Sequence, residues 1–249
     1  MLISILTSTF NSEEFLEEAL ASYQVQDHKE KELIIIDGAS SDKTLAIIAR
    51  HKESYDFLIS EKDKGIYDAL NKGIANASGE VIGILHSDDL FYDESVLTEV
   101  NRIFESDASL QALYGDLQYV KRDDPGKVIR NWVSGDWNIK KISFGWMPPH
   151  PALFIRKKCF EDFGNYNLKY HSAADYDLIL RFLYKHQIKT AYVPRVFMKM
   201  RVGGLSNQSL KNRLRANRED RQAMKENGIS FPLLVSFIKP LRKIKQFLK

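Results

Sequence analysis

The sequence has one cysteine and no long apolar run. Cys159 alone excludes a disulfide within the chain and a cysteine-based zinc site. No stretch approaches the ~20 apolar residues that a membrane-spanning helix needs. Residues 1–6 have neither a basic segment nor a small-residue cleavage site, so we expect a first strand there rather than a signal peptide. These absences favour a globular protein of the cytoplasm.

Two nucleotide-binding signatures are also missing. No G-x-G-x-x-G follows the first predicted strand, and G-x-x-x-x-G-K-[ST] occurs nowhere. The first absence argues against a dinucleotide-dependent dehydrogenase, and the second argues against a P-loop ATPase.

Charge is unevenly distributed, although the net charge is only +3. Residues 206–249 contain eleven Lys and Arg against three Asp and Glu, a net charge of +8, whereas residues 1–205 carry −5. Apolar residues between 233 and 248 are interleaved with the basic ones. We expect an amphipathic tail on an anionic membrane surface, with no nucleic acid partner. A helix packed on the body or against a second copy is the alternative, so oligomerisation stays open.

The first 90 residues alternate between predicted strands and helices. The strands cover 2–7, 32–37, 55–60 and 81–85, and the helices cover 12–23, 44–50 and 66–76. This alternation is typical of an α/β fold with a parallel sheet and helices on both faces. Later strands are predicted at 111–116, 117–121, 128–133 and 189–193, and later helices at 96–104, 157–163 and 209–227.

Polar side chains follow three of the predicted strands at their carboxyl ends. They are Thr7 to Asn11, Asp37, and the adjacent Asp88 and Asp89. Ligands of open α/β sheets bind at this edge. Two adjacent carboxylates are costly to bury unpaired, and a divalent cation that also carries substrate phosphates satisfies them. We interpret Asp88 and Asp89 as a metal–diphosphate platform, with a solvated turn as the alternative.

Five segments carry a resemblance to a known family. They read Thr7-Ser-Thr-Phe-Asn11, Ile36-Asp-Gly-Ala-Ser-Ser-Asp-Lys-Thr44, Asp63-Lys-Gly-Ile-Tyr-Asp-Ala-Leu-Asn-Lys-Gly73, Ala77-Ser-Gly-Glu80 and Ser87-Asp-Asp89. In this order and spacing the chain resembles family 2 glycosyltransferases of the GT-A fold, most of all the bacterial enzymes of colanic acid, capsule and O-antigen assembly.

The resemblance implies an architecture and an activity. Residues 1–205 would form a GT-A domain, a Rossmann-like α/β fold whose mixed and mostly parallel sheet has helices on both faces. Its nucleotide-binding half would be 1–110 and its acceptor half 111–205, followed by basic C-terminal helices in 206–249. The enzyme would move one sugar from a nucleotide-diphosphate sugar, preferably a UDP-sugar, to a hydroxyl of a glycan or lipid-linked acceptor. The Q-x-x-R-W motif of processive synthases is missing, so we expect one sugar per encounter.

The resemblance also assigns donor contacts. Thr7, Phe10, Asn11 and Asp37 would hold the base and ribose, because Phe10 offers a flat apolar contact and Asp37 an acceptor for an imide N–H. A core aromatic is the alternative for Phe10, and a turn-former is the alternative for Asp37. Lys64 would meet phosphate, unless it is only a solvated surface lysine.

The metal motif of the family, D-x-D, reads His86-Ser87-Asp88 here, so a histidine replaces the first acid. The resemblance implies that Asp88 contacts ribose or metal, and that Asp89 binds the metal or supports a residue that does. Magnesium or manganese would neutralise charge on the leaving nucleoside diphosphate.

Asp175 is the candidate general base. Apolar residues between 178 and 183 have helical spacing, which places Asp175 near a helix start. In the family an E-D or A-D pair stands here, and in this chain it is Ala174-Asp175. Inverting transfer needs a carboxylate to accept the proton of the acceptor hydroxyl. A helix N-cap, worth ~1 kcal/mol, is the alternative.

Three weaker candidates for acceptor or phosphate contact are Trp146, His150 and Arg201. Packing is the alternative for the tryptophan, and an ordinary flexible turn for the Arg201 loop. Two other functions stay open at this point. One is a sugar-phosphate nucleotidyltransferase, although the glycine-rich basic loop it needs is missing. The other is a non-catalytic nucleotide-sugar- or carbohydrate-binding module.

Overall fold

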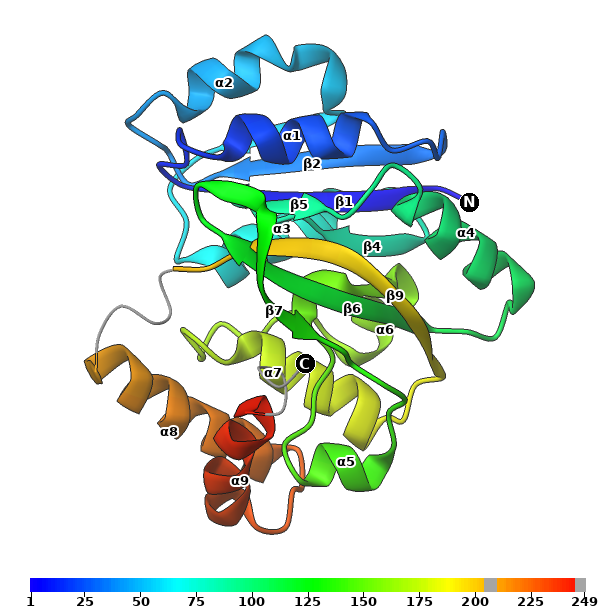
Figure 1. The fold of residues 1–249 in the computed structure, drawn as a ribbon, viewed down its shortest axis with the longest axis vertical. Helices are drawn as coiled ribbons and strands as arrows, with labels where there is room; N and C mark the ends of the chain where they lie inside the picture. The colour runs from blue at the N-terminus through cyan, green and yellow to red at the C-terminus, as the bar shows by residue number, and fades with distance from the viewer. Residues whose placement is uncertain (204–209, 245–249) are drawn as a thin grey trace.

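The protein is built on one curled sheet flanked by helices (Figure 1). The computed structural model describes residues 1–203 and 210–244. In this part of the chain the strand order is β3-β2-β1-β4-β8-β6-β9-β5, with β7 paired to β6 outside that path. The strands are β1 (Ile3–Thr9), β2 (Lys31–Asp37), β3 (Phe57–Ser60), β4 (Val81–Ile84), β5 (Asp89–Phe91), β6 (Ala112–Lys121), β7 (Asp124–Trp132), β8 (Leu153–Arg156) and β9 (Thr190–Arg201).

Strand direction changes across the middle of the sheet. β3, β2, β1 and β4 run parallel, as the alternating pattern of the first 90 residues predicts. β8 is antiparallel to both β4 and β6, and β5 is antiparallel to β9 at the edge. β6 and β9 are parallel to each other. The predicted mixed, mostly parallel α/β sheet is confirmed.

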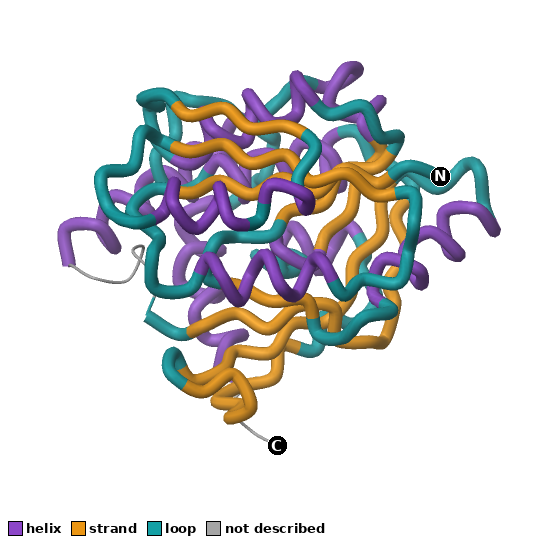
Figure 2. The backbone as a smooth tube through the Cα atoms, turned by 90° about the horizontal axis from the view of Figure 1, so that it is seen from above, coloured by secondary structure: helices purple, strands orange, loops and turns teal. Residues whose placement is uncertain are grey.

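Helices cover both faces of the sheet, as Figure 2 shows. They are α1 (Leu16–Gln24), α2 (Thr44–Arg50), α3 (Ile66–Asn76), α4 (Val96–Ser106), α5 (Ile139–Ser143), α6 (Lys157–Phe163), α7 (Ala174–Ile179), α8 (Leu210–Glu226) and α9 (Pro232–Ile244). α1, α2 and α4 share one core with Ile3 and Ile5 of β1. α3, α6 and α7 share the opposite core with Leu6. All seven residues of β1 are therefore buried, including polar ones such as Ser4 and Thr7.

The second half of the sheet differs from the prediction in length and continuity. The strands predicted at 111–116 and 117–121 form one strand, β6, and the strand predicted at 128–133 begins earlier, at Asp124 of β7. The strand predicted at 189–193 extends as β9 to Arg201. It is longer because β6 pairs along one side of it and β5 pairs on the other.

The C-terminal helices pack against the body. α8 contacts α7, and α9 turns back along α8. Asn227 donates a hydrogen bond of 2.9 Å from Nδ2 to Asp177 Oδ1 of α7. In the described residues no helix has the length and apolarity needed to cross a membrane. The first and last residues of the predicted tail, 206–209 and 245–249, lie outside the described part of the chain.

Candidate active site

The three polar strand ends meet at one edge of the sheet. β1 lies between β2 and β4, with Thr9 opposite Asp37 and Leu6 opposite Ile84. The loop after β1, the loop after β2 and the turn that contains Asp88 therefore leave the sheet side by side. Parallel strands bring their carboxyl ends together in this way, as predicted.

Asn11 joins the first two of these loops. Its backbone N–H donates to Ser40 Oγ at 2.8 Å, and its Oδ1 accepts from the Ser41 N–H at 2.9 Å. Its φ of 47° lies in the left-handed region, which asparagine adopts more readily than most residues. Asn11 therefore shapes the site by holding the loop after β1 against the loop after β2.

Asp37 holds the same loop from below. Its carboxylate accepts from the Ser40 N–H at 3.1 Å, from Ser40 Oγ at 2.5 Å and from Ser60 Oγ at 2.7 Å. The side chain is fully buried. In this structure Asp37 is the turn-former that the sequence offered as its alternative role. Thr7 is also fully buried, beneath the surface of the site.

Phe10 is on the surface, with 63% of its area exposed, so it is not a core aromatic. It lies against Gly38, where an added Cβ would stand 3.3 Å from Phe10 Cδ2 and 2.7 Å from Asp63 Oδ2. Glycine at 38 therefore lets Phe10 and Asp63 converge. Sequence reasoning did not assign Asp63, although it opens the third quoted segment. The neighbouring Lys64 is exposed.

Asp88 and Asp89 lie in opposite environments. Asp88 is half-buried, and no described side chain or N–H donates to its carboxylate. Asp89 opens β5 with 1% of its area exposed, and both of its carboxylate oxygens lack a partner in the described structure. Burial, and then the charge of Asp88, raise the pKa of Asp89 well above its usual value. Asp88 is therefore the accessible carboxylate of the pair.

The site at Asp88 suits a divalent cation shared with a bound ligand better than one held by protein side chains alone. The described residues contain no group of three or more His, Cys, Asp or Glu arranged to hold a metal ion. The unpartnered Asp88 carboxylate instead suits a hard cation that takes its remaining oxygens from a bound diphosphate. Asp89 lies behind Asp88, closed to solvent, and would support the site rather than bind the ion directly.

Arg201 does not reach the surface, contrary to the expectation of a phosphate contact. It is 1% exposed, and its guanidinium donates to Asp88 O at 2.8 Å, Arg122 O at 3.0 Å and Glu18 Oε2 at 2.6 Å. The same group lies over the Phe15 ring, 4.5 Å from its centroid. Arg201 is buried and its donors are used within the protein, so its role in this structure is to hold the turn at Asp88.

Asp175 lies in the first turn of α7 and is not its N-cap, which is Ala173. Its Oδ1 accepts from the Tyr67 hydroxyl at 3.1 Å and from the Tyr176 N–H at 2.8 Å. In the described residues nothing donates to Oδ2. The side chain is partly exposed, so one oxygen is held and the other is available.

An aromatic chain runs from Asp175 back into the protein. Tyr67 stacks on Tyr166 with ring centroids 5.6 Å apart, and the Tyr166 hydroxyl lies 2.7 Å from His150 Nε2. His150 is in turn 6.1 Å from His86 between ring centroids. Burial lowers the pKa of His150 to about 4, so its ring is neutral at pH 7. His150 is therefore an internal support in this structure and does not reach an acceptor.

His86 links Asp175 to the turn that carries Asp88. Burial and then His150 lower the pKa of His86, while the charges of Asp88 and Asp175 both oppose this. The contacts from Asp175 through Tyr67, Tyr166 and His150 lead to the same imidazole, which lies two residues before Asp88. The sequence separates these two acids by almost ninety residues, and the fold brings them together.

Trp146 is a packing residue, contrary to the expectation of a sugar contact. It is buried, its Nε1 donates to Ser134 O at 3.0 Å, and its ring meets Tyr114 edge-on at 5.6 Å. With both its face and its polar edge used inside the protein, the ring has no surface to offer an acceptor.

Comparison with known proteins identifies the family. A family model described as Glycosyl transferase family 2 matches residues 4–164. The chain belongs to this family. A PGL/p-HBAD biosynthesis glycosyltransferase of Mycobacterium bovis is 30% identical over 210 residues, which cover 83% of this chain and 79% of the relative. An uncharacterized glycosyltransferase of Mycobacterium tuberculosis is 29% identical over 187 residues, covering 72% and 68%.

Solved structures show the same fold. The crystal structure of Staphylococcus aureus TarS 1–349 matches with a TM-score of 0.72 at 17% identity, over 98% of this chain and 72% of that one. A mannosyltransferase of Pyrobaculum calidifontis in complex with GDP-Man and Mn²⁺ matches with a TM-score of 0.67 at 17% identity, over 96% and 69%. This family 2 glycosyltransferase therefore has the predicted GT-A fold.

Proposed function

We propose that this family 2 glycosyltransferase transfers one sugar, with inversion, from a UDP-sugar to a hydroxyl of a glycan or lipid-linked acceptor. Asp175 is the general base, and the product belongs to a cell-surface polysaccharide or glycolipid. The observation that carries the proposal is that Asp175, with one free carboxylate oxygen, is linked through Tyr67, Tyr166 and His150 to His86, two residues before the accessible Asp88. The TarS structure in complex with UDP-GlcNAc supports the choice of nucleotide.

The donor lies along the loops at the carboxyl ends of β1, β2 and β3 in this proposal. The exposed Phe10 ring stacks on the base, and Asp63 beside it accepts the imide N–H, the role that the sequence assigned to Asp37. Asn11 and Asp37 hold these loops in position, while Thr7 supports them from below. Lys64 faces solvent next to Asp63 and pairs with donor phosphate. Residues 1–110 thus serve the nucleotide and residues 111–205 the acceptor.

Asp88 would hold magnesium or manganese together with diphosphate oxygens. When bound, such an ion neutralises the charge that develops on the leaving nucleoside diphosphate. Arg201 keeps the Asp88 turn in place through its hydrogen bond to the Asp88 carbonyl. The mannosyltransferase complex with Mn²⁺ supports a divalent cation in this fold.

Asp175 would take the proton of the acceptor hydroxyl on its free Oδ2 as the hydroxyl oxygen attacks the anomeric carbon. The hydroxyl of Tyr67 fixes the carboxylate by donating to Oδ1. Tyr67 stays protonated because burial, and then the charge of Asp175, raise its pKa above the usual tyrosine value. Attack from the side of Asp175 and departure of the diphosphate toward Asp88 give inversion.

The test is Asp175→Asn, measured with UDP-sugar and an acceptor sugar while UDP binding is followed by calorimetry. General-base catalysis contributes about 10²–10⁴-fold, so we expect kcat to fall by that factor while the Kd for UDP stays unchanged. Asp162→Asn on α6, where the carboxylate pairs with Lys158 at the surface, is the matched control. Transfer at the wild-type rate by the Asp175 variant would remove the base assignment. Donor binding without transfer by the wild-type chain would favour the non-catalytic binding module.

A further inference from the structure

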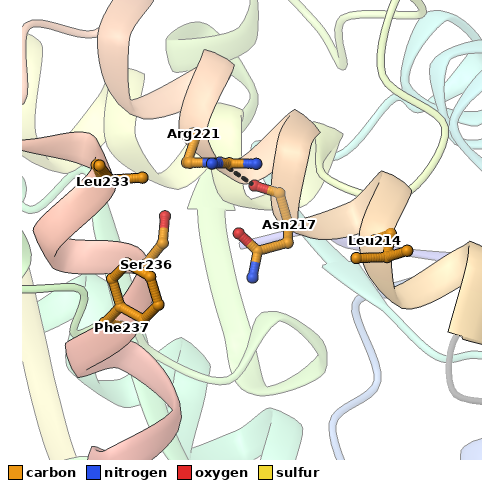
Figure 3. Close-up of a pocket in the computed structure, with 6 residues that line it drawn as sticks. All are labelled: Leu214, Asn217, Arg221, Leu233, Ser236 and Phe237. Atoms are coloured by element: carbon orange, nitrogen blue, oxygen red, sulfur yellow. Dashed lines mark hydrogen bonds between the residues drawn. The ribbon is translucent and has the colours of Figure 1, made fainter.

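The hairpin of α8 and α9 exposes large apolar side chains. Leu214 is 73% exposed, Phe231 71% and Phe237 70%, and Leu233 and Leu234 are also more than half exposed. Leu214, Leu233 and Phe237 line one cavity between the two helices, together with Asn217, Arg221 and Ser236 (Figure 3). We call the five apolar residues the hairpin surface.

Within the hairpin surface, Leu233, Leu234 and Phe237 form the exposed side of α9. The inner side packs through Val235, which is buried and stands 3.1 Å from the position a Cβ would occupy on Gly145. Lys239, one turn further, lies over the Tyr176 ring at 3.4 Å. A helix at a protein surface normally turns polar residues outward. Here the outward side is apolar, and exposed patches of this kind mark interaction sites.

Charge on the hairpin is arranged for an anionic partner. Residues 206–249 contain only three acids, and each is engaged within the protein. Glu219 accepts from the Ser172 N–H at 2.7 Å, and Asp220 pairs with Lys239 at 2.7 Å. Glu226 pairs with Lys169 and accepts from the Tyr170 hydroxyl.

Basic side chains remain on the outside of the same helix. Arg215, Arg218 and Lys225 are exposed. Because each of the three acids is paired within the protein, this side of α8 presents positive charge around an apolar surface. Burial of apolar side chains combined with attraction to anionic head groups is the pattern of interfacial helices on membranes.

The hairpin is also next to the candidate base. α8 packs on α7, which carries Asp175, and Ser172, three residues before Asp175, is held by Glu219. Figure 1 shows that α8 begins on the side of the molecule toward which β1 and β2 point.

We propose that the hairpin surface docks on an anionic lipid bilayer and that this docking delivers a lipid-linked acceptor to Asp175. Phe231, Leu234 and Phe237 enter the apolar layer, and Arg221 in the cavity pairs with a phosphate head group. The choice of acceptor rests on the proposed function, whereas the docking does not. The surrounding positive charge favours a membrane over a second copy of the chain, because two such surfaces would repel.

The experiment is co-sedimentation of the full chain with vesicles of phosphatidylcholine alone or with added phosphatidylglycerol. We expect binding to the anionic vesicles that weakens as salt rises. Leu233→Ser combined with Phe237→Ser removes two large apolar contacts, so we expect at least about tenfold weaker binding. Val25→Ser, at a residue 63% exposed after α1, is the matched control and keeps wild-type binding. Arg215→Gln with Arg218→Gln should weaken binding to anionic vesicles only.

Several results would overturn the docking surface. The wild-type chain could fail to bind either vesicle, or the Leu233/Phe237 variant could bind as well as the wild type. The chain could also form a dimer in light scattering that the same substitutions dissociate, with no binding to vesicles. Transfer to a soluble acceptor should be equal in wild type and variant, while transfer to a vesicle-embedded acceptor falls. Vesicle binding by a chain that transfers no sugar would contradict the proposed function and leave the docking intact.

Discussion

At the scale of single residues, the two oxygens of Asp175 have different neighbours. Oδ1 accepts from Tyr67 and from the Tyr176 N–H, whereas nothing in the described structure donates to Oδ2. A carboxylate held through one oxygen keeps its orientation and still offers a proton acceptor. This division of labour is what a positioned general base requires.

Tyr67→Phe tests that orientation. The substitution removes one hydrogen bond to a charged group, worth about 1.5–3 kcal/mol, and we expect kcat to fall about 10–100-fold with little change in KM for the donor. Steady-state kinetics measure both constants. Tyr184→Phe, which loses a hydroxyl near Gly228 away from the site, should leave both unchanged. A Tyr67 variant that loses donor affinity but not kcat would contradict the positioning role.

The accessible Asp88 predicts dependence on a divalent cation. Asp88→Ala, or treatment of the wild-type chain with EDTA, should lower kcat/KM by about 10²–10³-fold, since charge on the leaving diphosphate is no longer neutralised. Adding manganese should restore the treated wild-type chain but not the variant. Full activity after chelation would count against the cation.

At the scale of elements, buried carboxylates hold adjoining segments together. Glu32 of β2 is buried and accepts from Ser4 of β1, from the hydroxyl and the N–H of Ser78, and from the Gly79 N–H. One side chain thus joins β1, β2 and the loop before β4. Burial acts to raise the pKa of Glu32, but the hydrogen bonds from Ser4 and Ser78 outweigh it, and the pKa is lowered.

This lowered pKa predicts a pH-dependent contribution to stability. Ionised Glu32 stabilises the fold above the ordinary glutamate pKa, and the contribution is lost as pH falls through the lower pKa of the folded state. Glu32→Gln should therefore reduce the free energy of unfolding by about 1–3 kcal/mol at neutral pH, and by less in acid. Urea unfolding at both pH values measures this. Glu53→Gln, at an exposed position, is the control, and an equal loss at both pH values would disprove the linkage.

At the scale of the whole molecule, an acidic body carries a basic hairpin beside its site. The body, residues 1–205, has a net charge of −5 and the remainder +8. The three acids of the basic segment are each paired within the protein, so the positive charge seen in the sequence also lies on the surface of the hairpin. The vesicle prediction above belongs to this scale, because it depends on how α8 and α9 sit on α7 rather than on any one residue.

The sequence by itself determined the sheet in the first 90 residues, the acids at its carboxyl edge and the position of Asp175 near a helix start. Local periodicity and strand-end chemistry act over short distances, so they can be read without a fold. It also predicted a basic, amphipathic C-terminal segment.

Tertiary structure decided which of the candidate side chains are accessible. Trp146, His150 and Arg201 are all polar or aromatic enough for a site, yet each is buried by elements distant in the chain. Asp63, in the loop after β3, and Tyr67, in α3, gained candidate roles only because the fold places them beside Phe10 and Asp175. Exposure and partnership depend on long-range packing, which adjacent residues do not encode. For the same reason only the packed hairpin shows that the apolar side of α9 faces outward.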